Sequence, residues 1–261
     1  MDDAQIKLTI GPVATLTLAR PDARNAMTEA MGLEIARAVD VLNASDEVRV
    51  VLVRGEGVAF AAGGDFDFIE ARARAPGEEN RRVMGRFYRL FLSIRRLRAP
   101  SIAVLHGAAV GAGCCFALAC DLRLAASGAK LGLNFVRIGL HPGMGATYLL
   151  PRLVGPARAA ELLLTGRLVP AEEALALGLV NAVHPPEGLL VAATALAEEI
   201  AKGAPLAVQQ CKASLQRALE RSLDGCLEEE AYAQAIDYAS ADLLEGVAAF
   251  REKRAPRFSG R

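Results

Sequence analysis

The stretch SIAVLHGAAVGAGCCFALACD, residues 101–121, decides the fold of this chain. Its first five residues form a short apolar run after Pro100, which predicts a buried strand. Small residues fill positions 107–113, and an apolar helical pattern follows. A strand that runs through such a turn into a helix leaves the first N–H groups of the helix without internal partners. The turn is therefore expected to favour a negative charge.

The same pattern occurs once more, upstream. AFAAGGD, residues 59–65, follows a β-branched strand at 48–54 and precedes a helical pattern at 66–72. Two such turns could direct two main-chain N–H donors at one carbonyl oxygen, each contributing ~2.7–4 kcal/mol of transition-state stabilisation. The alternative is an ordinary strand-to-helix turn, with Asp65 as the helix N-cap and glycines that allow close packing.

Strands and helices alternate around these two turns. Residues 5–10 and 13–18 predict a hairpin, 28–43 and 78–97 predict helices, and 122–125 predict another strand. This alternation predicts an α/β fold. From residue 156 onward the pattern is helical, in six segments: 157–164, 171–177, 187–201, 205–218, 223–239 and 242–254. We expect an α/β core at 1–195 and a helical region at 196–261, forming one structural unit.

The composition excludes several classes of protein. Thirty basic residues balance thirty acidic ones, which argues against a nucleic-acid or membrane-surface binder. Five cysteines, two of them adjacent, form no disulfide pattern, and the three histidines have no metal-ligand spacing, so no metal is expected. The acidic start MDDAQIKLTI resembles no export signal, and no apolar run approaches the length of a membrane span. A cytoplasmic protein is expected.

Five segments together resemble the enoyl-CoA hydratase/isomerase (crotonase) family. They are AFAAGGD at 59–65, the glycine-rich block at 107–121, IGLHPGMG at 138–145, TGRLVPAEEALALGLVNAV at 165–183 and EGVAAFREKR at 245–254. The resemblance implies a spiral of ββα units with C-terminal helices that form trimers, or a dimer of trimers. It also implies an acyl-CoA thioester substrate, with coenzyme A as part of the substrate and no tightly bound cofactor. The oxyanion N–H groups should come from Gly64 and Ala112, where the family usually has glycine at the second position.

The resemblance also assigns substrate-binding positions. Arg24 corresponds to the segment at the adenine end of coenzyme A, and Phe250 and Lys253 correspond to tail positions that reach the nucleotide across a subunit boundary. The other expected contacts lie in or after the first turn, together with one position further along: Ala62, Asp65, Phe66, Asp67, Phe68 and Phe135. An ordinary surface role remains the alternative for the charged positions.

Both catalytic glutamates of the family's hydratases are replaced, by Cys115 and Phe135. A positioned acid or base contributes roughly 10²–10⁴-fold to a rate, so efficient hydration by the usual mechanism is not expected. Gly143 stands where some members have an aspartate. His141 is the best remaining acid or base, with a structural histidine as the alternative. Tyr88 and Tyr148 could donate a hydrogen bond.

Three functions follow from this pattern. The first is a lyase or isomerase that forms a thioester enolate with non-standard acid and base residues. The second is a thioester hydrolase or decarboxylase on the same scaffold, and the third is an acyl-CoA-binding protein without activity.

Overall fold

The computed structural model describes residues 4–261. Its first sheet has the order β1-β2-β3-β5-β7-β10. The strands are β1 (Ile6–Thr9), β2 (Val13–Leu18), β3 (Val50–Gly55), β5 (Ser101–Leu105), β7 (Leu122–Ala126) and β10 (Ala182–His184). β1 and β2 form the predicted antiparallel hairpin, and every other pairing in this sheet is parallel.

Both faces of the first sheet are covered, which explains why its central strands read as unbroken apolar runs. On β3, Val50 and Leu52 belong to a cluster with α7 (Leu189–Ala201), whereas Val51 and Val53 face the larger core on the other side. Side chains alternate between the faces of a strand, so one short segment contributes to two cores.

The second sheet consists of strands with three residues each, in the order β4-β6-β8-β9. They are β4 (Ala59–Ala61), β6 (Ala108–Val110), β8 (Lys130–Gly132) and β9 (Leu168–Pro170). The turns predicted at 59–65 and 107–113 therefore each begin with a strand, which was not expected. Three residues are too few for an alternating pattern to stand out in the sequence.

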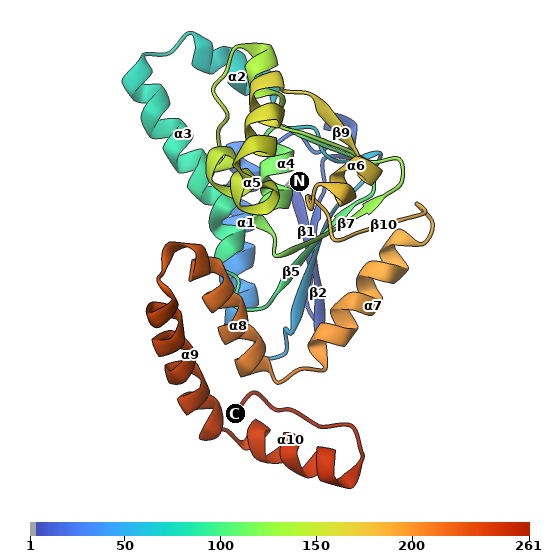
Figure 1. Ribbon diagram of the computed structural model, residues 1–261. Coiled ribbons are helices and arrows are strands. Elements are labelled where there is room, and N and C mark those ends of the chain that lie inside the picture. Colours follow the sequence, from blue (N-terminus) through green and yellow to red (C-terminus); the bar gives the residue numbers. More distant parts are fainter. Residues whose placement is uncertain (1–3) are drawn as a thin grey trace.

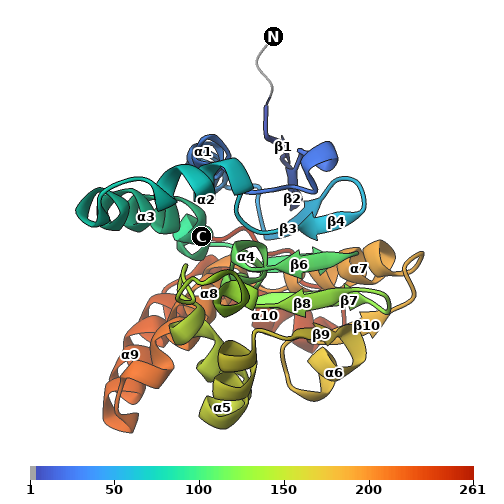
Figure 2. The same ribbon diagram turned by 90° about the horizontal axis from the view of Figure 1, so that it is seen from above.

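The chain alternates between the two sheets, one strand in each, and then forms helices. β3 and β4 precede α2 (Phe66–Ala73) and α3 (Gly77–Leu92), β5 and β6 precede α4 (Ala112–Ala119), and β7 and β8 precede α5 (Ala146–Thr165). Each turn of the chain is thus a ββα unit. Figure 2 shows β6, β8 and β9 side by side, as successive turns of this spiral.

The remaining helices are α1 (Glu29–Ala44), α6 (Ala171–Ala176), α7, α8 (Pro205–Arg217), α9 (Leu223–Tyr238) and α10 (Ala241–Glu252). One prediction was too short: α5 begins at Ala146, not 157, and its two parts meet at Gly155, whose φ of 77° is not helical. Another prediction was too long: the helix predicted at 78–97 ends at Leu92, and the chain continues as a 3-10 turn, Ser93–Arg96.

The C-terminal helices α9 and α10 extend away from both sheets (Figure 1). The expected division between 1–195 and 196–261 falls inside α7, whose Ala193 and Ala197 both pack on the first sheet. α8 also contacts the core, because its buried Lys212 donates to the carbonyl oxygen of Ala99 and pairs with Asp121, so the helices that leave the sheets are α9 and α10. Within residues 4–261, no helix combines the length and apolar character that spanning a membrane would need.

Candidate functional site

The two predicted turns lie against each other because β4 pairs in parallel with β6. Parallel strands end at the same edge of a sheet, so the segments after Ala61 and after Val110 meet there. Gly63 and Gly111 have φ values of 103° and 54°, which other residues rarely adopt. A Cβ on Gly63 would lie 3.0 Å from the carbonyl oxygen of Val110 and 3.8 Å from the nitrogen of Ala112. Glycine at 63 is what lets the two turns touch.

The first turn is fixed by a two-residue bridge to Met27. The N–H of Met27 donates to the carbonyl oxygen of Gly63 (2.8 Å), and the N–H of Asp65 donates to the carbonyl oxygen of Met27 (3.3 Å). In a parallel bridge the middle residue, here Gly64, turns its own N–H to the opposite side. β6 and the turn that follows it lie on that side of the first turn. Within residues 4–261, the Gly64 N–H has no acceptor.

Ala112 is the first residue of α4, so its N–H has no carbonyl group four residues earlier within the helix. Gly111 donates to the carbonyl oxygen of Gly132 (2.8 Å), and Cys115 donates to the carbonyl oxygen of Gly111 (3.1 Å). No main-chain acceptor in the described part of the chain takes the Ala112 N–H. All eight residues of α4 are buried, which holds this helix start in place.

Asn25 supports the first turn, a role that was not predicted from the sequence. It is fully buried, with a φ of 56°. Its amide nitrogen donates to three carbonyl oxygens, of Glu56, Ala59 and Phe60, and its amide oxygen accepts the N–H of Arg20 (2.9 Å). An asparagine tolerates a left-handed backbone better than most residues, so Asn25 ties the segment before Met27 to β4. Its place directly after a Pro-Asp turn was the available signal.

Asp65 caps α2, as its alternative interpretation predicted. Its carboxylate accepts the N–H of Asp67 (3.1 Å) and lies 3.3 Å from a guanidinium nitrogen of Arg20. Asp67 itself is exposed on α2. Both carboxylate oxygens of Asp65 are therefore engaged in holding the turn, and substrate contacts of Asp65 and Asp67 stay predictions.

Cys115, Tyr88 and Gly143 meet one helical turn beyond Ala112. The thiol of Cys115 donates to the carbonyl oxygen of Gly143, with 3.5 Å between sulfur and oxygen. A Cβ on Gly143 would lie 2.4 Å from the hydroxyl oxygen of Tyr88. The Tyr88 hydroxyl thus occupies the space of a side chain at 143. Tyr88 comes from α3, and the sequence indicated only that it could donate a hydrogen bond.

Burial keeps both ionisable groups of this cluster neutral. It raises the pKa of the Cys115 thiol well above its ordinary value, so this thiol is neither a nucleophile nor a base. Burial also raises the pKa of the Tyr88 phenol, and the neighbouring Cys115 adds to the shift. Tyr88 is therefore a neutral donor at physiological pH.

Aromatic side chains form an apolar wall beside this cluster. The Phe68 and Phe87 rings stack with centroids 5.3 Å apart, and Phe87 meets the Tyr88 ring edge-on at 6.4 Å. Phe135 is half-buried against the core in a 3-10 turn, Asn134–Ile138. Phe66, however, is 76% exposed, and Ala62 is also exposed. Of the predicted substrate contacts Ala62, Phe66, Phe68 and Phe135, only Phe68 and Phe135 pack against the core, and all four contacts stay predictions.

His141 lies exposed in the segment between Phe135 and α5, two residues before Gly143. None of the hydrogen bonds within residues 4–261 involves its ring. No hydrogen bond in the described part of the chain orients this imidazole, so its acid–base role stays a prediction.

The positions expected to contact the nucleotide lie in two places. Arg24 is exposed beside the first turn, where its carbonyl oxygen accepts the N–H of Ala62 (2.9 Å). Phe250 is 87% exposed near the end of α10, and Lys253 follows with a φ of 54°. α10 lies far below α2 in Figure 1, so one protomer does not bring these positions together.

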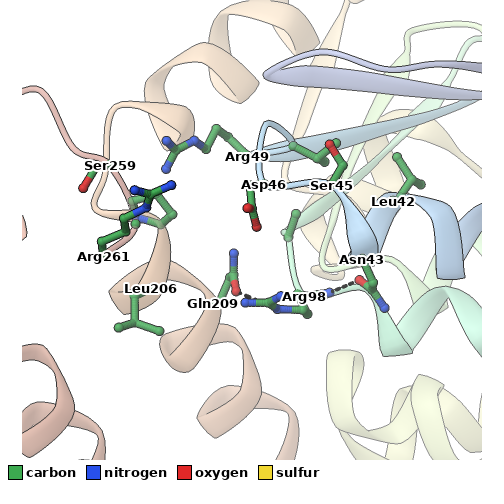
Figure 3. A pocket seen from close by; sticks show the side chains of 14 residues that line it. Leu42, Asn43, Ser45, Asp46, Arg49, Arg98, Leu206, Gln209, Ser259 and Arg261 are labelled. Atoms are coloured by element: carbon green, nitrogen blue, oxygen red, sulfur yellow. Dashed lines mark hydrogen bonds between the residues drawn. The ribbon is translucent and has the colours of Figure 1, made fainter. Parts of the chain in front are cut away.

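A polar hollow of about 250 Å³ lies elsewhere, at the amino end of β3. Figure 3 shows Asp46, Arg49 and Arg261 around it, with Arg98 and Gln209 on the facing side. Arg98 donates to the Gln209 amide oxygen (3.1 Å), and Arg49 donates to the carbonyl oxygen of Phe258 (3.3 Å). None of the residues that line this hollow belongs to the two turns, so the hollow is separate from the candidate site.

Comparisons with known proteins agree with this architecture. The family model described as enoyl-CoA hydratase/isomerase matches residues 10–261. A crotonyl-CoA hydratase from Syntrophomonas wolfei is 38% identical over 247 residues, covering 94% of each chain. A 2,3-dehydroadipyl-CoA hydratase from Escherichia coli is 34% identical over 249 residues, covering 95% of this chain and 96% of the relative.

A solved structure gives the same result. The enoyl-CoA hydratase from Bacillus anthracis superimposes with a TM-score of 0.92 at 35% identity, covering 98% of this chain and 100% of that one. The alternation between two sheets is therefore the crotonase spiral that the sequence motifs predicted. The chain belongs to the enoyl-CoA hydratase/isomerase family of acyl-CoA-processing enzymes.

Proposed function

We propose that this enzyme binds an acyl-CoA thioester with its carbonyl oxygen between the N–H groups of Gly64 and Ala112, and stabilises the enolate that forms there. The observation that carries the proposal is the pair of unused main-chain donors on adjoining turns. Donors held by packed structure need little reorganisation when charge develops on the thioester oxygen. Coenzyme A is then part of the substrate, and no tightly bound cofactor is proposed.

Hydration through two glutamates has little support, because positions 115 and 135 carry cysteine and phenylalanine. The relatives named above act on enoyl-CoA thioesters by name, and that supports the thioester class for this chain more than the hydration step. A thioester hydrolase that uses His141 has weaker support, since this imidazole is exposed and lacks an orienting partner.

A panel of thioesters in D₂O tests the proposal. Saturated, enoyl and 2-carboxyacyl-CoA substrates are incubated with the enzyme, and mass spectrometry follows deuterium at the α-carbon of the product. Any reaction through an enolate leaves deuterium there. Binding without deuterium in every arm would favour the acyl-CoA-binding alternative, and release of free coenzyme A alone would favour a hydrolase.

Ala112→Pro removes one donor and tests its role. Proline is well tolerated at the first position of a helix, so α4 should persist. We expect kcat to fall about 10²–10³-fold. Ala112→Gly, which keeps the N–H, and Leu223→Pro, at the exposed first position of α9, are the matched controls and should retain activity.

We also propose that the enzyme is a homotrimer or a dimer of trimers, assembled through its C-terminal helices. α9 buries none of its side chains within one protomer. The cytoplasmic location stays a prediction.

A further inference from the structure

In the described part of the chain, the Tyr88 hydroxyl is a polar group without a hydrogen-bond partner, and it lies in the cluster one helical turn beyond Ala112. Cys115 stands three residues after Ala112 on α4 and therefore on the same helical face. Its thiol reaches Gly143, where the Tyr88 oxygen fills the side-chain space. Within residues 4–261, the Tyr88 hydroxyl makes no hydrogen bond. It is also only half-buried, so a ligand can reach it.

The same cluster contains no base. Positions 115 and 135 lack carboxylates, the Cys115 thiol stays protonated, and the exposed His141 makes no hydrogen bond to the cluster within residues 4–261. A neutral phenol can give a proton to an enolate carbon but cannot remove one from a thioester. The arrangement therefore fits reactions that generate the enolate by breaking a carbon–carbon bond.

We infer that Tyr88 is the proton donor of this site and that the substrate is an acyl-CoA thioester with a carboxylate on its α-carbon. The inference rests on the proposed function, because a donor beside the α-carbon is useful only if an enolate forms there. Neither position 115 nor position 135 would repel a substrate carboxylate. The apolar wall of Phe68 and Phe87 would solvate it poorly, which favours its loss as neutral carbon dioxide.

The chemistry balances without a cofactor. The bond between the α-carbon and the carboxylate breaks, and its electron pair moves into the thioester to form the enolate. Carbon dioxide leaves, and the enolate oxygen accepts hydrogen bonds from Gly64 and Ala112. The α-carbon then takes the Tyr88 proton, and the phenolate regains a proton from water. The net reaction consumes one proton and releases one carbon dioxide.

The test uses the full chain with malonyl-CoA and methylmalonyl-CoA, and with butyryl-CoA and crotonyl-CoA as substrates that lack the carboxylate. Carbon dioxide release and deuterium in the product are measured in D₂O. We expect carbon dioxide from at least one 2-carboxyacyl substrate. Tyr88→Phe keeps the ring packing and should lower kcat about 10²–10⁴-fold. Tyr148→Phe is the matched control, since the Tyr148 hydroxyl bonds Glu220 instead, and it should leave kcat unchanged.

A second variant, Gly143→Ala, displaces the Tyr88 hydroxyl without changing Tyr88 itself. In Gly143→Ala the added methyl group would lie 2.4 Å from the Tyr88 oxygen and displace it, so a comparable loss is expected. Full kcat in Tyr88→Phe would overturn the role of this residue. No carbon dioxide from either 2-carboxyacyl probe, with deuterium incorporated from butyryl- or crotonyl-CoA, would overturn the substrate class and leave the proposed function intact. No deuterium in any arm would overturn both.

Discussion

The helices α4 and α9 are both rich in small and apolar residues, yet their surroundings are opposite. α4 buries all eight of its residues, whereas α9 buries none of its sixteen. The core therefore fixes the direction of the Ala112 N–H within a single protomer. α9 instead exposes a set of large apolar side chains: Leu223, Leu227, Tyr232, Ile236 and Tyr238. This difference supports both proposals: a carbonyl site whose donors are positioned within one chain, and an assembly that covers the exposed side chains of the C-terminal helices.

Asn25→Ala is expected to have the largest effect, because Asn25 supports the first turn in the rigid, buried part of the protomer. It leaves three carbonyl oxygens without their donor and places alanine at a φ of 56°. We expect the free energy of unfolding to fall by about 4 kcal/mol, measured by urea denaturation. In Asn25→Gly the backbone adopts this φ without strain, so this variant measures the loss of the hydrogen bonds alone. Asn43→Ala, at an exposed pair of bonds, should cost about 1 kcal/mol; an equal loss in both would contradict a special role for Asn25.

Gly113→Ala tests how tightly α4 packs against β4. The new Cβ would lie 2.4 Å from the carbonyl oxygen of Ala61, and main chain cannot rotate away as a side chain does. Overpacking of this kind should cost about 3 kcal/mol and shift the Ala112 N–H, so kcat should fall as well. Gly128→Ala, where nothing lies within 4 Å of the added methyl group, is the control. Unchanged thermal stability in Gly113→Ala would show that this contact relaxes freely.

Leu227→Glu tests whether the exposed side chains of α9 are covered by a partner subunit. Leu227 is 53% exposed on α9, so a charge there should change the protomer's own stability by less than about 0.5 kcal/mol. In the proposed trimer it would bury a charge, and light scattering should then show dissociation toward the monomer. Glu228→Gln, exposed on the same helix, should not change the assembly. A trimer that survives Leu227→Glu would place the interface elsewhere.

Glu245→Gln should have the smallest effect, and one that depends on pH. Glu245 accepts hydrogen bonds from the Arg254 guanidinium (2.6 Å) and the Arg257 N–H (2.7 Å), and Arg254 is the larger cause of its pKa of about 2. A lowered pKa means that the carboxylate stabilises the fold above its ordinary pKa, and that this contribution is lost as pH falls toward 2. The Tm of the variant should be slightly lower at pH 7 and equal near pH 2. A constant difference would exclude the ion pair as its cause.

The sequence predicted those parts of the fold whose pattern is local and long enough to read. The hairpin, β3, β5 and most helices follow from apolar periodicity, and the order of motifs predicted the spiral. The strands of the second sheet were missed because each has only three residues. The start of α5 was missed because Pro151 interrupts its pattern.

The candidate site likewise has a part that local sequence patterns predict and a part that only tertiary contacts create. The two turns could be predicted because small residues after buried strands are visible in the sequence. Within them, Gly64 and Ala112 were assigned by the resemblance to the family, and their role stays a prediction. Tyr88 could not be placed, since it comes from α3 and reaches Gly143 only in the folded chain. Asn25 was missed for a related reason: its partners Glu56, Ala59 and Phe60 are more than thirty residues away. Contacts of this kind depend on tertiary structure and not on any local period.

The left-handed glycines at 63 and 111 have a consequence for how such an enzyme can change over evolutionary time. In the proposed site the donors belong to the main chain at these turns, so substitutions at positions 88, 115 and 135 do not remove an N–H group. Replacement of glutamate by cysteine at 115 and by phenylalanine at 135 could then change the reaction while thioester binding persists. The scaffold is for the same reason a sound starting point for laboratory redesign, with positions 88, 115, 135 and 143 as the ones to vary first.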